Sequence, residues 1–285
     1  ARIVAGGTDI LPNLKHRLDE PPVLVSLDAV SELRRVEVID DQLVIGAGNT
    51  LSEVSEDKRV LEHFPMLADA AGRVASPLIR NMGTLGGNVN LDTRCRYVNQ
   101  TEFWRGAIGG GCIKSEGNVC HVVPKGRNCV AAMSSDSVPV LIALEAVFVL
   151  VGPNGEREVE AGSYFKADGT AHTVREAGEL LTEVRIPLPK GSRKTAYVKW
   201  SVRKSIDFPL VSVALRFDMS SDEAGATIEA AHIVAGVLVE RLNNQVMHVN
   251  MIQSQYGTSI QDPAYREHWT RQTIGLLLYG AAARQ

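Results

Sequence analysis

The sequence predicts an α+β protein with a mixed first part and an antiparallel sheet near the C-terminus. In the first part, short β-branched runs alternate with segments of helical periodicity. After residues 189–194 ("PKGSRK") come three strand-like stretches joined by polar links, which is typical of an antiparallel meander: "TAYVKWSV", "FPLVSVALRF" and "TIEAAHIVAG". We therefore expect a first domain over residues 1–188 and a second over residues 189–285, which ends in an amphipathic helix over 265–285.

The N-terminus predicts a strand, a tight turn and a helix in that order. A β-branched run ends in the glycine pair Gly6 and Gly7, and apolar residues then recur at helical spacing over 10–18. Thr8 or Asp9 would cap this helix. Further short strands are expected at "PPVLVSL" and "QLVIGAG".

Helices and a hairpin are expected in the middle of the chain. Thr50 and Glu53 have the spacing of a capping box at a helix start, and residues 60–74 have helical periodicity that Pro65 interrupts. The run "VPVLIALEA" suits a buried helix, "AVFVLVGPNGEREVE" suits a hairpin, and "LLTEVRIPLP" suits the last strand of the first domain.

Composition restricts the class of protein. The 285 residues include 30 basic and 33 acidic side chains, and the formal charge of -3 argues against a nucleic-acid partner. No run of 18 apolar residues and no signal-peptide pattern is present, so we expect no membrane insertion and a cytoplasmic location. In that reducing compartment, cysteines are expected to bind metal, to act in catalysis or to lie buried rather than to form disulfides.

Two glycine turns stand about 80 residues apart, in "AGGTDI" and "GTLGGN". Paired glycines let backbone N–H groups converge on an anion, although each pair alone is also typical of a plain tight turn. Neither has the Gly-x-Gly-x-x-Gly pattern, which argues against a Rossmann dinucleotide site. Two such turns in one domain would suit the two phosphates of a dinucleotide.

All four cysteines lie in one segment, residues 91–131: Cys95, Cys112, Cys120 and Cys129, spaced 17, 8 and 9 residues apart. Four thiolates suit either a four-iron four-sulfur cubane or a tetrahedral zinc ion. Zinc sites commonly use Cys-x-x-Cys pairs, and none is present, so the spacing favours the cubane. Unligated buried cysteines are the third alternative.

The same segment carries features that suit an anionic cluster. N–H groups of Gly109 to Gly111 would be able to approach the sulfurs. Six basic residues could offset the negative charge of a cubane with four thiolates: Arg94, Arg96, Lys114, His121, Lys125 and Arg127.

The glycine turns carry a family resemblance. "VAGGTDILPNLK" and "IRNMGTLGGNV" resemble the two pyrophosphate loops of the FAD-binding subunit of molybdenum hydroxylases, the xanthine dehydrogenase and carbon monoxide dehydrogenase group. Three further stretches follow in the family's order: "SSDSVPVLIALEA", "GELLTEVRIPLP" and "YVKWSVRKSIDFPLVSVAL". The resemblance implies a two-part FAD-binding domain of the molybdopterin-dehydrogenase flavoprotein type over 1–188, and a C-terminal flavoprotein domain with a three-stranded antiparallel sheet and helices.

The resemblance also implies a set of FAD-binding residues. The pyrophosphate would be held by Ala5, Gly6, Gly7, Thr8 and Asp9 and by Thr84, Leu85, Gly86, Gly87 and Asn88. Asp136 would contact the ribityl or ribose part, and Leu181 and Lys199 would lie near the flavin ring. Two alternatives remain open, because Asp136 could simply cap the helix that follows it and Lys199 could face solvent from an alternating strand. The family's chains begin well before the first glycine loop, which implies a preceding strand and helix.

Most members of the family have no cysteine-rich segment in this subunit. The sites "TRCRY", "GGGCIK", "VCHV" and "RNCV" are similar to the four-iron cluster ligands of the β subunit of 4-hydroxybenzoyl-CoA reductase, in the aromatic-degradation branch of the family. This resemblance implies an FAD and iron–sulfur electron-transfer subunit with no catalytic residue of its own. Expected partners are a molybdopterin subunit and a two-iron two-sulfur subunit in a duplicated heterotrimer, and a low-potential carrier such as ferredoxin.

Two other functions stay open from the sequence. The chain could be the medium subunit of a molybdenum hydroxylase that passes electrons from FAD to NAD or another acceptor. It could also be a zinc-stapled scaffold whose glycine loops are plain turns.

Overall fold

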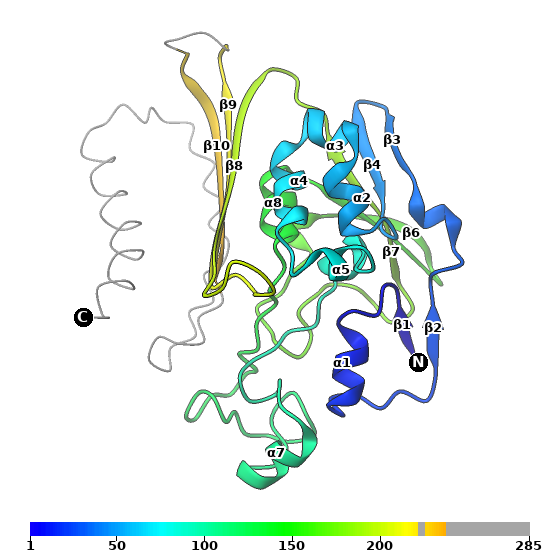
Figure 1. Ribbon diagram of the computed structural model, residues 1–285, viewed down its shortest axis with the longest axis vertical. Coiled ribbons are helices and arrows are strands. Elements are labelled where there is room, and N and C mark those ends of the chain that lie inside the picture. Colours follow the sequence, from blue (N-terminus) through cyan, green and yellow to red (C-terminus); the bar gives the residue numbers. More distant parts are fainter. Residues whose placement is uncertain (222–225, 238–285) are drawn as a thin grey trace, which may run out of the picture.

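The computed structural model describes residues 1–221 and 226–237 (Figure 1). Helices and sheets are mixed in the first part, and an antiparallel three-stranded sheet follows, so the predicted α+β class is confirmed. The helix expected over 265–285 lies outside the described residues. No helix in the described part of the chain has the length and apolarity needed to cross a membrane.

The N-terminus forms a small parallel unit. Strand β1 (Arg2–Val4) pairs in parallel with β2 (Leu24–Ser26), and helix α1 (Ile10–Lys15) lies between them in the chain. Gly7 makes the turn after β1 with a φ of 72°, a left-handed conformation that favours glycine. The predicted strand, turn and helix are thus all present.

A five-stranded antiparallel sheet follows, with the strand order β3-β4-β7-β5-β6. The expected hairpin at 153–155 joins its last two strands, and the strand that ends the first domain is its central member. The strands are β3 (Val36–Ile39), β4 (Gln42–Gly46), β5 (Val147–Gly152), β6 (Gly155–Glu160) and β7 (Leu180–Pro187). Two short 3-10 turns, η1 (Ser31–Arg34) and η2 (Ala161–Ser163), flank it in the chain.

Short helices form a layer between this sheet and the C-terminal sheet (Figure 1). The predicted capping box is present: the Thr50 hydroxyl accepts from the Glu53 N–H, and the Glu53 carboxylate accepts from the Thr50 N–H. The helical run is interrupted at Pro65, as predicted: one helix ends at His63 and the next begins at Pro65. The helices are α2 (Leu51–Glu56), α3 (Lys58–His63), α4 (Pro65–Gly72), α5 (Pro77–Arg80), α6 (Leu85–Val89) and α8 (Ser137–Ala143).

The C-terminal sheet packs on the helical layer. Its strands β8 (Ser192–Trp200), β9 (Val211–Met219) and β10 (Ile228–Val237) form the predicted meander in the order β10-β9-β8. Every residue of α8 is buried, and this helix packs against both α4 and the C-terminal sheet. One continuous apolar core therefore joins the two sheets and the helices between them.

The cysteine segment, residues 91–131, lies at one end of the molecule (Figure 1). Its one α-helix is α7 (Glu102–Ile108), and Tyr97, Val98 and Cys112 form a small apolar cluster of their own. The segment is attached to α1, because the Glu102 N–H donates to the His16 carbonyl and the buried Arg105 guanidinium donates to the Arg17 carbonyl. It is thus fixed beside the first glycine loop.

Candidate functional site

The two glycine loops lie directly against each other. A Cβ added to Gly6 would stand 1.7 Å from the carbonyl oxygen of Met82, so only glycine fits at this point. Thr8 is equally close, because its hydroxyl oxygen would lie 3.2 Å from a Cβ added to Gly83. Loops that are about 80 residues apart in the sequence therefore form one surface.

The first glycine loop has free hydrogen-bond donors. The backbone N–H groups of Gly6, Gly7 and Thr8 donate to no acceptor among the described residues. Exposed N–H groups held in a fixed turn are suited to an anion such as a pyrophosphate. This loop, which includes Ala5 and Asp9, is therefore the part of the predicted phosphate site that is free to bind a ligand.

The second glycine loop uses its N–H groups inside the protein. Leu85 donates to the Asn49 carbonyl and Gly86 to the Ala47 carbonyl, each over 2.8 Å, while the Gly87 N–H donates to the Thr84 hydroxyl over 3.0 Å. A Cβ on Gly86 would lie 2.7 Å from the Cβ of Ala47. Gly86 is therefore required by the packing of the second glycine loop on Ala47.

Gly87 differs from its neighbour. It is exposed, and an added Cβ would meet only the Thr84 hydroxyl oxygen, at 3.1 Å. Of the two glycines in this pair, Gly87 is thus the one that is open to solvent.

Two of the predicted FAD residues have buried side chains. The Asn88 carbonyl oxygen accepts from Ser135 over 2.6 Å and from Ser137 over 2.5 Å, which links α6 to the start of α8. Leu181 lies in β7 and belongs to the apolar core. Their side chains support the site from within.

Asp136 and Lys199 form a buried ion pair. Lys199 Nζ lies 2.9 Å from Asp136 Oδ2, and the hydroxyl of Tyr197 donates to Asp136 Oδ1 over 2.6 Å. The Asp136 side chain makes no capping hydrogen bond to α8, and the Lys199 side chain is only 8% exposed. The two simpler interpretations, a helix cap and a solvent-facing lysine, are therefore wrong.

This network shifts the protonation of its members. Burial raises the pKa of Asp136, while the ammonium of Lys199 and the hydroxyl of Tyr197 act in the opposite direction. Burial and the neighbouring carboxylate raise the pKa of Tyr197 far above its ordinary value, so the phenol stays protonated. Lys199 also donates to the Arg73 carbonyl over 3.0 Å, so α4, α8 and β8 are tied together here.

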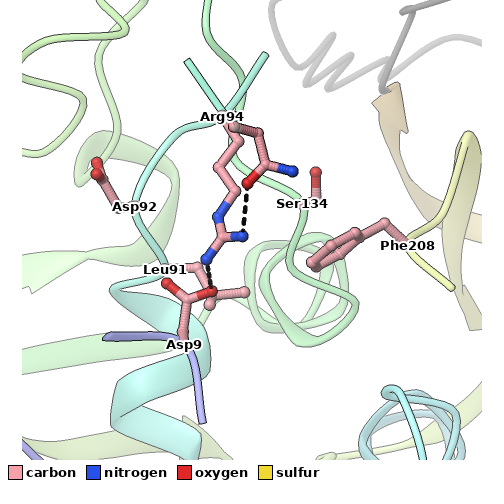
Figure 2. Close-up of a pocket in the computed structure, with 7 residues that line it drawn as sticks. Asp9, Leu91, Asp92, Arg94, Ser134 and Phe208 are labelled. Carbon is pink, nitrogen blue, oxygen red and sulfur yellow. Dashed lines mark hydrogen bonds and ion pairs between the residues drawn. The ribbon is translucent and has the colours of Figure 1, made fainter. Parts of the chain in front are cut away.

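A pocket with an empty volume of about 410 Å³, partly open to solvent, lies beside the first glycine loop (Figure 2). The Arg94 guanidinium donates to the Asp9 carboxylate and, over 2.9 Å, to the Asn99 carbonyl oxygen. Burial raises the pKa of Asp9, and Arg94 acts in the opposite direction. The lining residues are Asp9, Leu91, Asp92, Arg94, Asn99, Ser134 and Phe208.

Sequence reasoning did not assign Arg94, Ser134 or Phe208 to this site. Ser134 lies two residues before Asp136, and Phe208 belongs to the link between β8 and β9. The available signal in the sequence was that these residues lie near residues predicted to bind FAD. The pocket brings together the first glycine loop, the cysteine segment and the C-terminal sheet.

The four cysteines converge. All are free thiols, with Cys112 and Cys129 buried and the other two half-buried. Burial raises the pKa of Cys95, and negative charge on Cys129 and Cys112 would raise it further. Burial likewise raises the pKa of Cys129, which Cys112 and Cys120 would also raise. The thiols are therefore close enough to interact electrostatically.

Backbone donors point at three of the sulfurs. The Val98 N–H donates to Cys95 Sγ over 3.4 Å, the Val123 N–H donates to Cys120 Sγ over 3.3 Å, and the Ala131 N–H donates to Cys129. Two of the three donors expected from the sequence are used elsewhere, because the N–H groups of Gly109 and Gly110 both donate to the Arg105 carbonyl. A backbone donor two or three residues after a cysteine is the local signal that the sequence analysis missed.

Within residues 1–221 and 226–237, no group of three or more His, Cys, Asp or Glu side chains is arranged to hold a metal ion. The described cysteines thus do not form the compact tetrahedral set that a zinc ion requires, with Zn–S bonds of about 2.3 Å.

Comparison with known proteins identifies the family of this chain. Residues 1–189 match the FAD-binding domain of molybdopterin dehydrogenase. The chain belongs to this family. It contains the FAD-binding domain of the molybdenum hydroxylase type, as the glycine loops predicted.

Individual relatives agree with this assignment. The aldehyde oxidoreductase FAD-binding subunit PaoB of Escherichia coli K12 is 31% identical over 223 residues, which cover 75% of this chain and 70% of that protein. The carbon monoxide dehydrogenase medium chain of Hydrogenophaga pseudoflava is 30% identical over 215 residues, which cover 75% of this chain and 60% of that one. This chain thus spans about three fifths of that medium chain.

A solved structure shows the same fold. Quinoline 2-oxidoreductase from Pseudomonas putida 86 superposes with a TM-score of 0.61 at 28% identity, over 84% of this chain and 67% of that chain. The arrangement of glycine loops, helical layer and C-terminal sheet is therefore shared with proteins of this family.

The two neighbouring glycines of the second loop give a matched test. Gly86→Ala should lower the free energy of unfolding of the FAD-free protein by about 1–3 kcal/mol, because its Cβ overlaps Ala47. Gly87→Ala should leave that stability nearly unchanged and weaken FAD binding, because this position faces the ligand. Urea unfolding of the FAD-free protein and titration with FAD measure the two effects. Wild-type FAD affinity in Gly87→Ala would remove the second loop from the cofactor contact.

The buried ion pair gives a prediction with a pH dependence. Lys199→Met leaves the Asp136 carboxylate buried without a cation, which should cost about 3–5 kcal/mol near neutral pH. The raised pKa of Asp136 means that the native state binds a proton more tightly than the unfolded state, so this acid destabilises the fold as pH rises. The loss in Lys199→Met should therefore be larger at pH 7 than at pH 4.

The control for this experiment is the double variant Asp136→Asn/Lys199→Met, which removes both charges and should lose the pH dependence. Urea unfolding at the two pH values measures it. Equal losses at pH 4 and pH 7 in Lys199→Met would show that the pair is not electrostatically coupled.

Proposed function

We propose that this chain carries FAD and a four-iron four-sulfur cluster, and that it transfers electrons within a molybdenum-dependent oxidoreductase. The observation that supports the proposal is the convergence of four thiols in one segment that is fixed beside the first glycine loop. Arg94 connects the cysteine segment to the first glycine loop, because it contacts Asp9 and directly precedes Cys95.

The thiols suit a cluster better than a zinc ion. Sulfurs around one zinc ion must come within roughly 4 Å of one another, given Zn–S bonds of about 2.3 Å. In a cubane the iron–sulfur core stands between the ligands, so thiols that interact without forming a compact set are appropriate. The N–H donors at Cys95, Cys120 and Cys129 would also stabilise thiolates bound to iron.

The first glycine loop suits the FAD pyrophosphate. The free N–H groups of Gly6, Gly7 and Thr8 would bind its oxygens, while the second loop would support them from behind and expose Gly87. Asp136, Leu181 and Lys199 complete the proposed FAD site. When bound, FAD converts between two-electron and one-electron transfer, and the protein holds and orients it.

Substrate chemistry is proposed to take place in another subunit. The resemblance of the cysteine segment to 4-hydroxybenzoyl-CoA reductase favours an aromatic acyl-CoA as the substrate. A molybdopterin subunit would bind it, a subunit with two-iron clusters would conduct electrons, and the heterotrimer would be duplicated by symmetry. A reduced carrier such as ferredoxin would supply electrons through the cubane.

The cluster is tested by single cysteine substitutions. Each change of Cys95, Cys112, Cys120 or Cys129 to serine should lower the iron content of anaerobically purified protein below four per chain, because one thiolate ligand is lost. Ser115→Ala, in the same segment, is the control and should keep four irons. Four irons and an unaltered electron paramagnetic resonance spectrum in any serine variant would exclude that cysteine, and zinc in the wild-type protein would favour the scaffold.

Electron flow is tested on the assembled complex. Rapid mixing with a reduced ferredoxin-type donor should reduce the cubane and then FAD at a rate at least equal to turnover. The isolated chain should exchange electrons between its two centres but should not convert an aromatic acyl-CoA. Fast reduction by NADH, with a cubane that never changes oxidation state, would instead support the medium subunit of an NAD-linked hydroxylase.

A further inference from the structure

The seven basic residues of the cysteine segment are not equivalent. Four have exposed positions: Arg96, His121, Lys125 and Arg127. Three are held inward: Arg105 is buried, and the side chains of Arg94 and Lys114 are 20% and 13% exposed. Arg105 attaches the segment to α1 through the Arg17 carbonyl. Arg94 contacts Asp9 in the first glycine loop, so Lys114 is the inward cation that remains without an assigned role.

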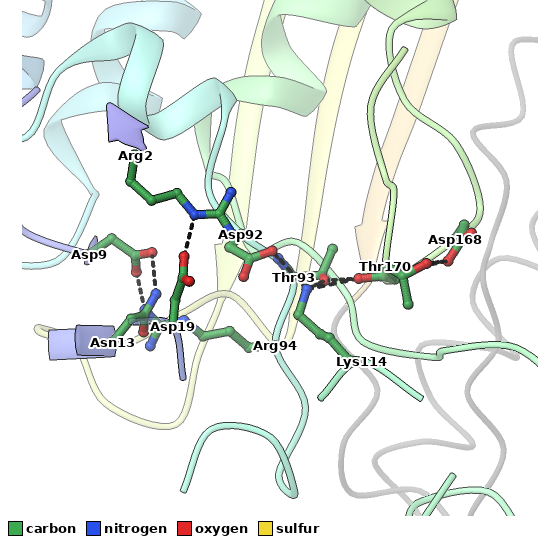
Figure 3. Close-up of polar contacts among 11 residues, drawn as sticks. Arg2, Asp9, Asn13, Asp19, Asp92, Thr93, Arg94, Lys114, Asp168 and Thr170 are labelled. Carbon is green, nitrogen blue, oxygen red and sulfur yellow. Dashed lines mark hydrogen bonds and ion pairs between the residues drawn. The ribbon is translucent and has the colours of Figure 1, made fainter. Parts of the chain in front are cut away.

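Lys114 is fixed by three acceptors (Figure 3). Its Nζ lies 2.7 Å from Asp92 Oδ1 and 2.9 Å from the Gly169 carbonyl oxygen, and it also donates to the Thr93 hydroxyl. The Thr93 hydroxyl in turn donates to the same Gly169 carbonyl. With three partners for its three N–H groups, the ammonium has one well-defined place.

The Lys114 ammonium lies beside Cys129. The Gly169 N–H donates to the Cys129 carbonyl over 3.2 Å, and a Cβ on Gly169 would lie 2.6 Å from Cys129 Sγ. The carbonyl that holds Lys114 thus belongs to the residue that packs on the thiol.

Asp92 only partly cancels this charge. Its side chain is 55% exposed, so water screens the carboxylate, whereas the ammonium is largely shielded from solvent. The ammonium is therefore the less screened charge of this pair.

We propose that Lys114 is a positioning residue that sets the reduction potential of the iron–sulfur cluster by holding its ammonium beside Cys129. The proposal rests on the proposed function, because it requires the cluster. Reduction adds one electron to a cluster that is already anionic, so a fixed cation stabilises the reduced form more than the oxidised form. Removal of the cation should make the cluster harder to reduce.

The test uses the full chain, loaded with FAD and purified anaerobically. Iron, sulfide and FAD are counted, and the midpoint potential of the cluster is titrated by electron paramagnetic resonance. Lys114→Met should lower the equilibrium constant for reduction at least tenfold, which is about 59 mV for a one-electron couple. Lys114→Arg keeps the charge and should shift that constant less than threefold.

Two further variants provide controls. Lys125→Met removes an exposed cation from the same segment and should shift the constant less than threefold, because water screens that charge. Asp92→Asn removes the anion that faces Lys114 and should shift the potential in the opposite direction, so that the cluster becomes easier to reduce.

The outcomes distinguish a failure of the proposed cluster from a failure of the proposed role of Lys114. A wild-type chain without iron would overturn the cluster, and the role of Lys114 with it. Four irons in the wild type and in Lys114→Met, with the same potential, would overturn the role of Lys114 alone. If Lys114→Met loses iron, Asp92→Asn decides: a raised potential supports the proposal, and an unchanged or lowered one overturns it.

Discussion

The close approach of Gly6 to Met82 is the contact on which the rest of the site depends. There is no room for a side chain where the Cα of Gly6 meets the Met82 carbonyl, so the N-terminal unit and the helical layer can touch there only through backbone. The second loop is itself fixed to the large sheet, because Gly86 packs on Ala47 immediately after β4. The first glycine loop is thereby placed without using its own N–H groups, which stay available for an anion.

The C-terminal sheet is fixed by polar contacts at both ends of α8. At the first end, Asp136 pairs with Lys199 of β8. At the other end, Arg216 of β9 donates to the Ala143 carbonyl over 3.0 Å and to Glu145 over 2.8 Å. A cation at the C-terminal end of a helix also complements its free carbonyl groups. The sheet that carries Lys199 therefore cannot slide along α8 without breaking a buried ion pair, which gives the proposed flavin side of the site a fixed wall.

Local patterns in the sequence predicted the elements of this fold well. Turn glycines, the capping box at Thr50, the helix break at Pro65 and the meander all depend on neighbours in the chain, and the structure contains each of them. The resemblance at the glycine loops also identified the family. The role of each glycine loop could not be predicted from local patterns. Gly86, for example, packs against Ala47, 39 positions earlier in the chain, and no local rule connects the two.

Some predictions about single residues failed for the same reason, because their partners are distant in the sequence. Asp136 precedes a helix and so has the pattern of a cap, yet a lysine and a tyrosine 60 residues later compete for its carboxylate, and the buried ion pair prevails. At Gly109 and Gly110 the N–H groups are not available to the sulfurs, because the Arg105 carbonyl takes both and closes α7, where Gly110 adopts a φ of 77° that favours glycine. Long-range partners decide which local option is used, and they become visible only in three dimensions.

The order of residues 92–95 gives the cysteine segment its place in the molecule. Asp92 holds Lys114, Thr93 contacts Gly169, and Arg94 contacts Asp9. Consecutive Cα atoms are about 3.8 Å apart, so Cys95 cannot move away from these anchors. The thiols and the first glycine loop thus keep a fixed separation within one chain. Electron exchange between the proposed cluster and FAD would for this reason need no partner subunit to bring the two centres together, and a partner would act only on what enters or leaves them.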